Sequence, residues 1–191
     1  MSNQQIEESI KKHTPSGSTP KMSMPKVEVP SEFKKDSNAT NKTFSTIMGE
    51  IVWLLTQSPA HKHLALSDLE WMIMPPILLN QFKIYHNEEQ PVGVALWGYL
   101  SPEAEIRLKA VSRISPQDWG NGASLDQESG LVAKEGGTLW LIEVISPFND
   151  EKNNHQQQML ADLMQTSLKG QKFKIMRMNP GTSVKEVVTL G

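Results

Sequence analysis

The sequence predicts an α/β domain with a mixed central sheet flanked by helices. Three observations support this class. Two helical patterns come first, runs typical of strands follow them, and one more helical pattern separates the last two strand-like runs. The chain carries no internal repeat, so a tail and a single domain of about 150 residues account for its length.

The first helix is expected over Phe44–Thr56, where apolar residues recur with the spacing of an amphipathic helix. It should end before the following proline, because the residue before a proline disfavours the helical region. A second helix is expected over Ser67–Met74. Ser67 is its expected N-cap, Glu70 completes a capping box, and Pro75-Pro76 should end the helix.

A β-hairpin is expected next. Gln81–His86 and Pro91–Tyr99 have the alternation and the β-branched and aromatic content of strands, with four polar residues as the turn between them. Ser101–Arg113 fits either a short helix or a third strand. Gly120–Gly137 is expected to be a long glycine-containing loop with no apolar face.

The last third of the chain supplies the expected centre of the sheet. Thr138–Ile145 is an almost wholly apolar run, typical of a central strand. Asn154–Leu168 has the apolar spacing of a helix, and Gly170 is placed to stop it. Phe173–Met178 alternates and is expected to be the last strand.

Residues 1–42 differ from the rest of the chain. Prolines recur at positions 15, 20, 25 and 30 in a stretch rich in Ser, Thr and Lys, and its opposite charges nearly cancel. Such a segment buries too little apolar surface to offset its conformational entropy. We therefore expect a disordered tail over 1–42, either inert or docking a partner, and a folded domain over 43–191.

The composition excludes several classes of function. Lys and Arg total 19 against 21 Asp and Glu, a formal charge of −2, which argues against binding nucleic acid or an anionic membrane through a basic surface. The absence of cysteine removes a disulfide scaffold, a thiol nucleophile and thiolate-bound zinc. No apolar run resembles a signal peptide or a membrane span, so we expect a cytoplasmic protein with no stable membrane insertion.

Histidine is the most informative residue type for catalysis. The chain has no phosphate-binding glycine motif, zinc-protease motif or serine-hydrolase motif. The solvated surface is expected to hold three of the five histidines, His13, His86 and His155. His61 follows the first helix through a tight turn and is either a catalytic base or a structural histidine. It forms a His-x-His pair with His63, but no third ligand lies nearby in the sequence, so a metal site is not expected.

Glu143 is the second candidate, because it is a carboxylate inside the apolar run Thr138–Ile145. A carboxylate in a central strand is costly unless it is paired with a lysine, an arginine or a histidine. A carboxylate is also the usual group that fixes the tautomer of a catalytic imidazole. The alternative is an edge-strand glutamate that faces solvent.

Several motifs resemble, in order and spacing, those of one known family. In the first half they are Gly49–Leu55, Ser58–His61, Met74–Ile77 and Asn80–Phe82. In the second half they are Trp97, Leu100-Ser101, Glu103–Ile106, Asp118-Trp119, Trp140–Phe148 and Phe173–Pro180. Over roughly residues 45–191 the chain resembles the RTX toxin-activating lysine acyltransferases of the hemolysin-activating type.

The resemblance implies a GNAT-like, acetyltransferase-related fold and an acyltransferase domain over 43–191. Members take a fatty acyl group from acyl-acyl carrier protein and form an amide on internal lysines of an RTX protoxin in the cytoplasm, which activates the toxin. By resemblance, His61 is the essential histidine, Glu143 stands for the partner aspartate, and Ser58 is the serine of the same turn. No bound cofactor is implied, since the acyl-acyl carrier protein is a co-substrate.

Amide formation gives a histidine a clear role. A free lysine amine has a pKa of about 10.4, so a base must take its proton before it attacks a thioester. His61 either acts directly or forms an acyl-imidazole first, and the sequence leaves both open. The acyl chain needs an apolar groove, and its candidate lining is Trp53, Trp97, Ile77 and Leu78, which are equally good core residues.

Three departures from the family pattern leave alternatives open. Glu143 is one methylene longer than the aspartate, and a polar insertion lies between Asn121 and Thr138. The family usually continues past the position of Gly191 with a helical segment, which puts the expected homodimer in doubt. The alternatives are a non-catalytic binding module or chaperone for the toxin or a carrier protein, and an ordinary acetyl-coenzyme A N-acetyltransferase.

Overall fold

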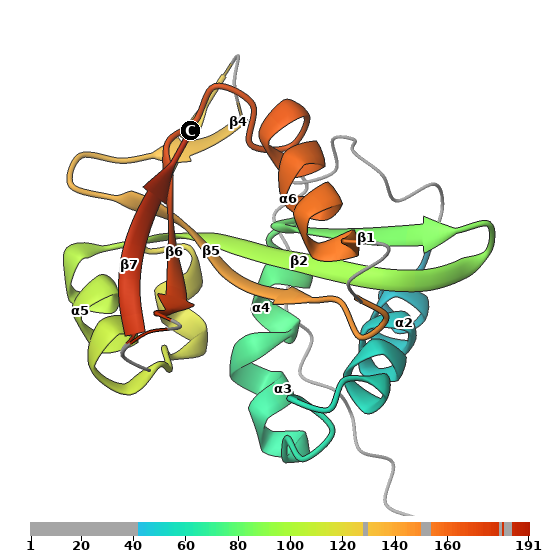
Figure 1. Cartoon of the computed structure of the whole chain (residues 1–191). Helices are drawn as coiled ribbons and strands as arrows, with labels where there is room; N and C mark the ends of the chain where they lie inside the picture. Colours follow the sequence, from blue (N-terminus) through green and yellow to red (C-terminus); the bar gives the residue numbers. More distant parts are fainter. Residues whose placement is uncertain (1–41, 128–129, 150–153, 180, 182–184) are drawn as a thin grey trace, which may run out of the picture. The chain divides into compact units, whose positions relative to one another are not determined.

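A five-stranded mixed sheet organises the part of the chain described by the computed structural model, which comprises residues 42–127, 130–149, 154–179, 181 and 185–191 (Figure 1). The sheet order is β1-β2-β5-β6-β7. The strands are β1 (Phe82–Asn87), β2 (Gln90–Leu100), β5 (Thr138–Ile145), β6 (Phe173–Met178) and β7 (Lys185–Leu190). Their neighbours run antiparallel except for β5 and β6, which are parallel. The predicted α/β class with a mixed sheet is confirmed, and the GNAT-like arrangement stays a prediction.

The predicted tail over 1–42 lies outside the described residues, apart from Lys42. Its boundary with the domain at 43 therefore stays a prediction.

Helices cover both faces of the sheet, and each face has its own core. On one face lie α2 (Phe44–Gln57), α3 (Leu66–Met72), α4 (Met74–Leu78) and α5 (Pro102–Val111). The other face is covered by α6 (His155–Gln165). The residues of β2 alternate between the two cores, with Leu96 in the first and Ala95 and Trp97 in the second, as expected for side chains that point to opposite faces of a strand. None of the described helices is long and apolar enough to cross a membrane.

The first helix forms as predicted, but the second begins differently. The N-cap of α3 is Ala65, whose N–H donates to Oδ2 of Asp68 at 3.1 Å. Ser67 lies inside the helix, so the predicted cap at Ser67 with Glu70 is wrong. The helix α3 ends at Met72, shortly before Pro75-Pro76 as predicted, and the two prolines then lie in the first turn of the next helix, α4. Proline is tolerated there because the first turn leaves its N–H groups unpaired in any case.

The segment Ser101–Arg113 fitted either a helix or a strand in the sequence. In the structure it forms the helix α5. The side-chain oxygen of Ser101 accepts a hydrogen bond from the N–H of Ala104 at 3.3 Å, which caps the helix.

The predicted loop over Gly120–Gly137 is wrong for two of its segments, because β3 (Ala123–Asp126) and β4 (Gly130–Ala133) pair as a small antiparallel sheet. Strands of four residues carry too little alternation to be detected in a sequence. The hairpin packs where Gly122 meets β2, and a Cβ at Gly122 would lie 2.4 Å from the backbone of Leu100. Only a glycine allows this approach.

The predicted strands β5 and β6 form with the expected bounds, but β6 is not the last strand. β7 pairs with it antiparallel along its whole length, with Phe173 opposite Leu190 and Met178 opposite Lys185. The sequence of β7 mixes charged and apolar residues at an edge of the sheet, which hides the strand pattern. The helix α6 ends at Gln165, three residues before the predicted end, and Gly170 has a positive φ of 73° in the turn that follows.

Candidate active site

The end of α2 forms a tight turn that brings His61 back onto Ser58. The N–H of Ser58 donates to the carbonyls of Leu54 and Leu55, and its own carbonyl accepts from the N–H groups of His61 and Lys62 at 3.0 and 2.9 Å. The helix therefore ends in a closed turn. As a result, Oγ of Ser58 lies 2.7 Å from Nδ1 of His61, in hydrogen-bond contact.

A β-bulge in β5 directs Glu143 toward this turn. Leu96 pairs with Glu143 and Trp97 with Leu141, so β5 carries one extra residue, Ile142, at this point. Ile142 packs into the core beneath α2–α5, whereas Leu141 and Val144 belong to the core beneath α6. Simple alternation would place Glu143 on the α6 side with Leu141. The bulge breaks that alternation, and bulges commonly redirect a side chain in this way.

The predicted site residues Ser58, His61 and Glu143 come together from two elements. Oε1 of Glu143 lies 3.5 Å from Nε2 of His61, so the imidazole is between a hydroxyl and a carboxylate. Oε1 of Glu143 also accepts the N–H of Val144 at 3.2 Å. Exposure rises along the row, from 6% for Ser58 to 16% for the side chain of His61 and 35% for that of Glu143. The site is therefore closed at Ser58 and accessible at Glu143.

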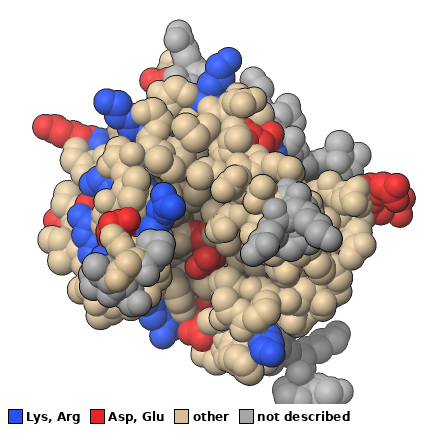
Figure 2. Space-filling model, in the orientation of Figure 1, with Lys and Arg blue, Asp and Glu red and all other residues tan. Residues whose placement is uncertain are grey.

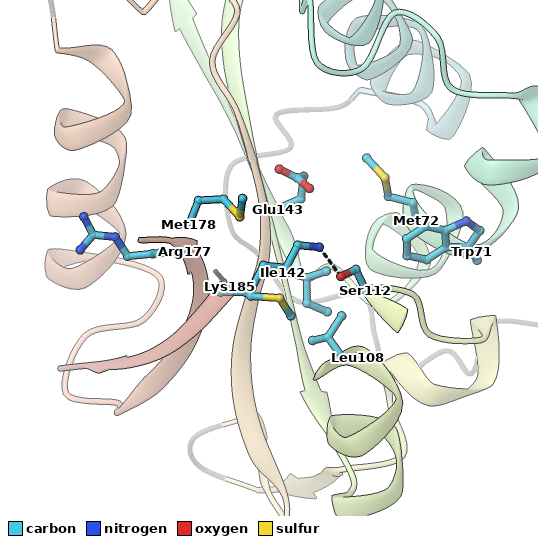
Figure 3. Close-up of a pocket in the computed structure, with 10 residues that line it drawn as sticks. Trp71, Met72, Leu108, Ser112, Ile142, Glu143, Arg177, Met178 and Lys185 are labelled. Carbon is cyan, nitrogen blue, oxygen red and sulfur yellow. Dashed lines mark hydrogen bonds between the residues drawn. The ribbon is translucent and has the colours of Figure 1, made fainter. Parts of the chain in front are cut away.

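Two cavities adjoin Glu143, one toward each face of the sheet. The first, of about 190 Å³, lies between α3, α5 and strands β5–β7, and its lining includes Trp71, Leu108 and Lys185 (Figure 3). The second, of about 470 Å³, lies between α6 and the same strands. Both cavities are lined by Ile142 and Glu143 from β5 and by Met176 and Arg177 from β6.

The short ladder between β5 and β6 explains why these cavities exist. Only Trp140–Lys174 and Leu141–Ile175 pair across the two strands. Beyond them the strands diverge, as Figure 1 shows. Glu143 and Arg177 therefore face an opening in the sheet rather than each other's backbone.

The profile of the RTX toxin acyltransferase family matches residues 40–190. The chain belongs to this family.

Individual relatives agree with the family assignment. The chain is 26% identical over 157 residues to the RTX-III toxin-activating lysine-acyltransferase ApxIIC of Actinobacillus pleuropneumoniae, covering 82% of this chain and 78% of the relative. It is 28% identical over 142 residues to the protein-lysine myristoyltransferase HlyC of Escherichia coli, covering 74% and 72%. A shorter match of 103 residues, 30% identical, joins it to the leukotoxin-activating lysine-acyltransferase LtxC of Aggregatibacter actinomycetemcomitans. The resemblance and the acyltransferase class predicted from the sequence are confirmed.

The other histidines of this acyltransferase differ in their surroundings. His63 is exposed next to His61. His86 is exposed, as predicted, and its Nε2 lies 3.4 Å from Oε2 of Glu50 and 3.1 Å from Nζ of Lys42. His155 is partly buried at the start of α6, and His13 lies outside the described residues.

Arg177 and Lys185 form a cationic side of the acyltransferase, next to the opening between β5 and β6. Lys185 donates to Oγ of Ser112, and Arg177 extends away from the centre of the first cavity (Figure 3). Within the part of the chain that the structure describes, no carboxylate forms an ion pair with either residue. In Figure 2 most of the visible Lys and Arg lie on the left half, where Figure 1 places α5, β6 and β7. No pattern in the sequence predicts this grouping, because it joins α5 to β6 and β7, which are far apart in the chain.

The four residues predicted to line an apolar groove for the acyl chain do not line the cavities beside Glu143 in the structure. Ile77 and Trp97 belong to the two cores, and Trp53 packs its ring against Phe148 with centroids 5.8 Å apart. Neither of the two cavities beside Glu143 is lined by these three residues or by Leu78. The residues that line the second cavity come instead from β5, α6, β6 and β7.

Proposed function

We propose that this chain transfers a fatty acyl group from the thioester of an acyl-acyl carrier protein to the side-chain amine of internal lysines in an RTX protoxin, and that it does so in the cytoplasm. The observation that carries the proposal is the imidazole of His61 between the hydroxyl of Ser58 and the carboxylate of Glu143, next to an opening in the sheet. Two of its relatives, an RTX-III toxin-activating lysine-acyltransferase and a protein-lysine myristoyltransferase, support the same acceptor.

The chemistry requires one base and balances without a cofactor. The lysine ammonium first releases one proton to solvent, the neutral nitrogen then bonds to the thioester carbonyl carbon, and the carbon–sulfur bond breaks. His61 accepts the proton of the attacking amine and returns it to the leaving thiolate. The carrier protein leaves with a free thiol, and the protoxin keeps the amide.

Accessibility assigns the two ring nitrogens of His61 different roles. Ser58 is buried on the Nδ1 side, whereas Glu143 is partly exposed on the Nε2 side. The amine therefore approaches Nε2, and Nδ1–H donates to Oγ of Ser58, which holds the ring in place. The carboxylate of Glu143, which lies beside Nε2, then stabilises the imidazolium that forms through its opposite charge.

The cationic side beside the opening supports a carrier protein as donor. An acidic partner is attracted by Arg177 and Lys185, which have no carboxylate of their own to neutralise them among the described residues. This grouping also explains how a chain with a formal charge of −2 recruits an acidic protein.

One observation favours the non-catalytic alternative. The contact between His61 and Glu143 is 3.5 Å long, which exceeds the usual length of an N–H···O hydrogen bond. A binding module that retained the family's residues without its activity would show such a loosened pair.

Intact mass of the protoxin separates the two functions. The chain is co-expressed with each of several RTX protoxins in cells that supply acyl-acyl carrier protein. We expect the mass of at least one protoxin to rise by an acyl group with the wild type and to stay unchanged with His61→Ala. A chain that binds protoxin equally well with and without His61 and never changes its mass would establish the binding module instead.

A further inference from the structure

The larger cavity beside Glu143 has the size of a ligand site. Its volume is about 470 Å³, inside the range of roughly 300–1,000 Å³ that small-molecule sites occupy. It lies on the α6 face of the sheet, whereas His61 follows α2 and comes from the other face. A ligand in this cavity therefore reaches the histidine only through the opening between β5 and β6.

The opening provides that route. Ile142, Glu143, Met176 and Arg177 line this cavity and also the smaller one on the opposite face. No ladder pair joins β5 and β6 beyond Leu141–Ile175. Glu143, which contacts His61, therefore lies at one end of the larger cavity.

Apolar side chains line the part of the cavity away from Glu143. Leu190 stands opposite Phe173 on the paired part of β6 and β7, away from Glu143 and Arg177. Leu160 of α6 covers the cavity from above the sheet, and it packs at the edge of the core beneath α6. The apolar lining consists of Leu141, Ile142, Val144, Leu160, Ile175 and Leu190, with Met176 at the opening.

The cavity also has a polar lining. Apart from Glu143 it consists of Arg177, at the opening, and of Gln156 and Gln157, in the first turn of α6. A ligand matched to this cavity has a reactive polar end at Glu143 and an extended apolar body toward Leu190.

We propose that the cavity beneath α6 holds the acyl chain of the donor, with its thioester at Glu143, and that Leu160 and Leu190 select the chain length. The inference rests on the proposed function and adds to it the site and the residues that set acyl-chain specificity. A chain too long for the cavity has to displace Leu160 or Leu190, and a chain too short leaves apolar surface uncovered.

Transfer from a mixture of donors tests the inference. Purified full-length chain is given a protoxin and an equimolar mixture of acyl-acyl carrier proteins that differ by single pairs of methylenes, and the products are weighed intact. Each buried methylene changes affinity about fourfold. We therefore expect Leu160→Trp to shift the preferred chain by at least one pair of methylenes toward shorter donors, about fifteenfold in product ratio. Leu160→Ala should shift the ratio toward longer donors.

A matched control measures the general effect of placing a tryptophan on α6. Ala161 is exposed on the next position of α6 and does not line the cavity, so Ala161→Trp should keep the wild-type ratio. Opposite shifts from Leu160→Trp and Leu160→Ala are not expected from misfolding. Leu190→Trp, at the far end, should also favour shorter donors.

A binding measurement separates this inference from the proposed function. The same acyl-acyl carrier proteins are titrated calorimetrically into the His61→Ala chain, which needs no catalysis. A ranking by chain length that changes with Leu160 supports the cavity even if no protoxin is acylated. If wild type acylates a protoxin and the Leu160 variants keep its length preference in both assays, the cavity does not hold the acyl chain. Binding to the His61→Ala chain that does not depend on chain length overturns the inference as well.

Discussion

At the residue scale, His61 depends on a hydroxyl and a carboxylate that are 85 residues apart in the sequence. The turn after α2 fixes Ser58 on Nδ1 of the ring, and the bulge in β5 brings Glu143 to Nε2. The two contacts engage both ring nitrogens, so the orientation of the imidazole is set by groups from both ends of the domain.

We predict that His61→Ala lowers the rate of protoxin acylation by about 10²–10⁴-fold, the usual contribution of a general base. The control is His63→Ala, because His63 is exposed two residues away and should leave the rate unchanged. Initial rates at saturating donor provide the measurement. Equal losses in both variants would assign the effect to the turn rather than to the imidazole.

Glu143 acts through its charge in the proposed mechanism. Opposite unit charges about 4 Å apart attract by about 1 kcal/mol in water and about 4 kcal/mol near a protein surface. We therefore expect Glu143→Gln to lower kcat by about tenfold or more, since each 1.36 kcal/mol is a factor of ten. Glu143→Asp keeps the charge and should retain more activity than Glu143→Gln. A Gln variant as active as the wild type would mean that the carboxylate has only a structural role.

At the element scale, Glu105 ties α5 to the central strands. Its carboxylate accepts hydrogen bonds from Lys109, from Lys174 at 2.8 and 3.0 Å, and from Nε1 of Trp140 at 3.3 Å. Burial by itself raises the pKa of Glu105, but the hydrogen bonds from Lys109, Lys174 and Trp140 outweigh it and lower the pKa from 4.5 to about 2. The ionised form therefore stabilises the fold next to the opening.

A folded-state pKa below the ordinary value gives stability that is present above pH 4.5 and lost as the pH falls toward about 2. We predict that Glu105→Gln lowers the free energy of unfolding by about 1.5–3 kcal/mol at pH 7, the usual value of hydrogen bonds to a charged group. The difference from wild type should shrink at pH 3. Urea unfolding at the two pH values provides the test, and a difference independent of pH would contradict the role of the ionised carboxylate.

At the scale of the whole domain, the opening between β5 and β6 is where the charge and the apolar space of the site meet. Arg177 and Lys185 lie on its cationic side, and the larger cavity extends beneath α6. The donor in the proposed reaction has the same two parts, an acidic protein and an apolar chain.

We predict that Arg177→Glu raises KM for acyl-acyl carrier protein by about tenfold with little change in kcat, because a charge at the rim of an interface acts mainly on association. Lys134→Glu is the matched control, since Lys134 is exposed and its backbone N–H donates to Gly122 beside the small hairpin β3–β4. The wild-type KM should also rise with salt. Equal changes in KM for the two variants would show an effect of net charge alone.

Several predictions made from sequence are correct because they depend on local rules. The extent of α2, the hairpin β1–β2 and the bounds of β5 follow from periodicity, and the helix at 102–111 was one of two stated possibilities. The errors share a physical cause. The strands β3, β4 and β7 are only four to six residues long and depend on pairing with their neighbouring strand, so they carry little pattern of their own. Pro75-Pro76 lies in the first turn of the separate helix α4, a position where proline is tolerated.

The sequence by itself determined the family, the acyltransferase class, and the residues Ser58, His61 and Glu143 as candidates, because motifs and residue types are properties of the chain. Only the tertiary structure decided that these three side chains meet, since a bulge at Ile142 and a turn after α2 must both form to bring them together. It alone also located the two cavities and the cationic side. Each of these is made by elements distant in sequence, where the β5–β6 ladder ends after two pairs.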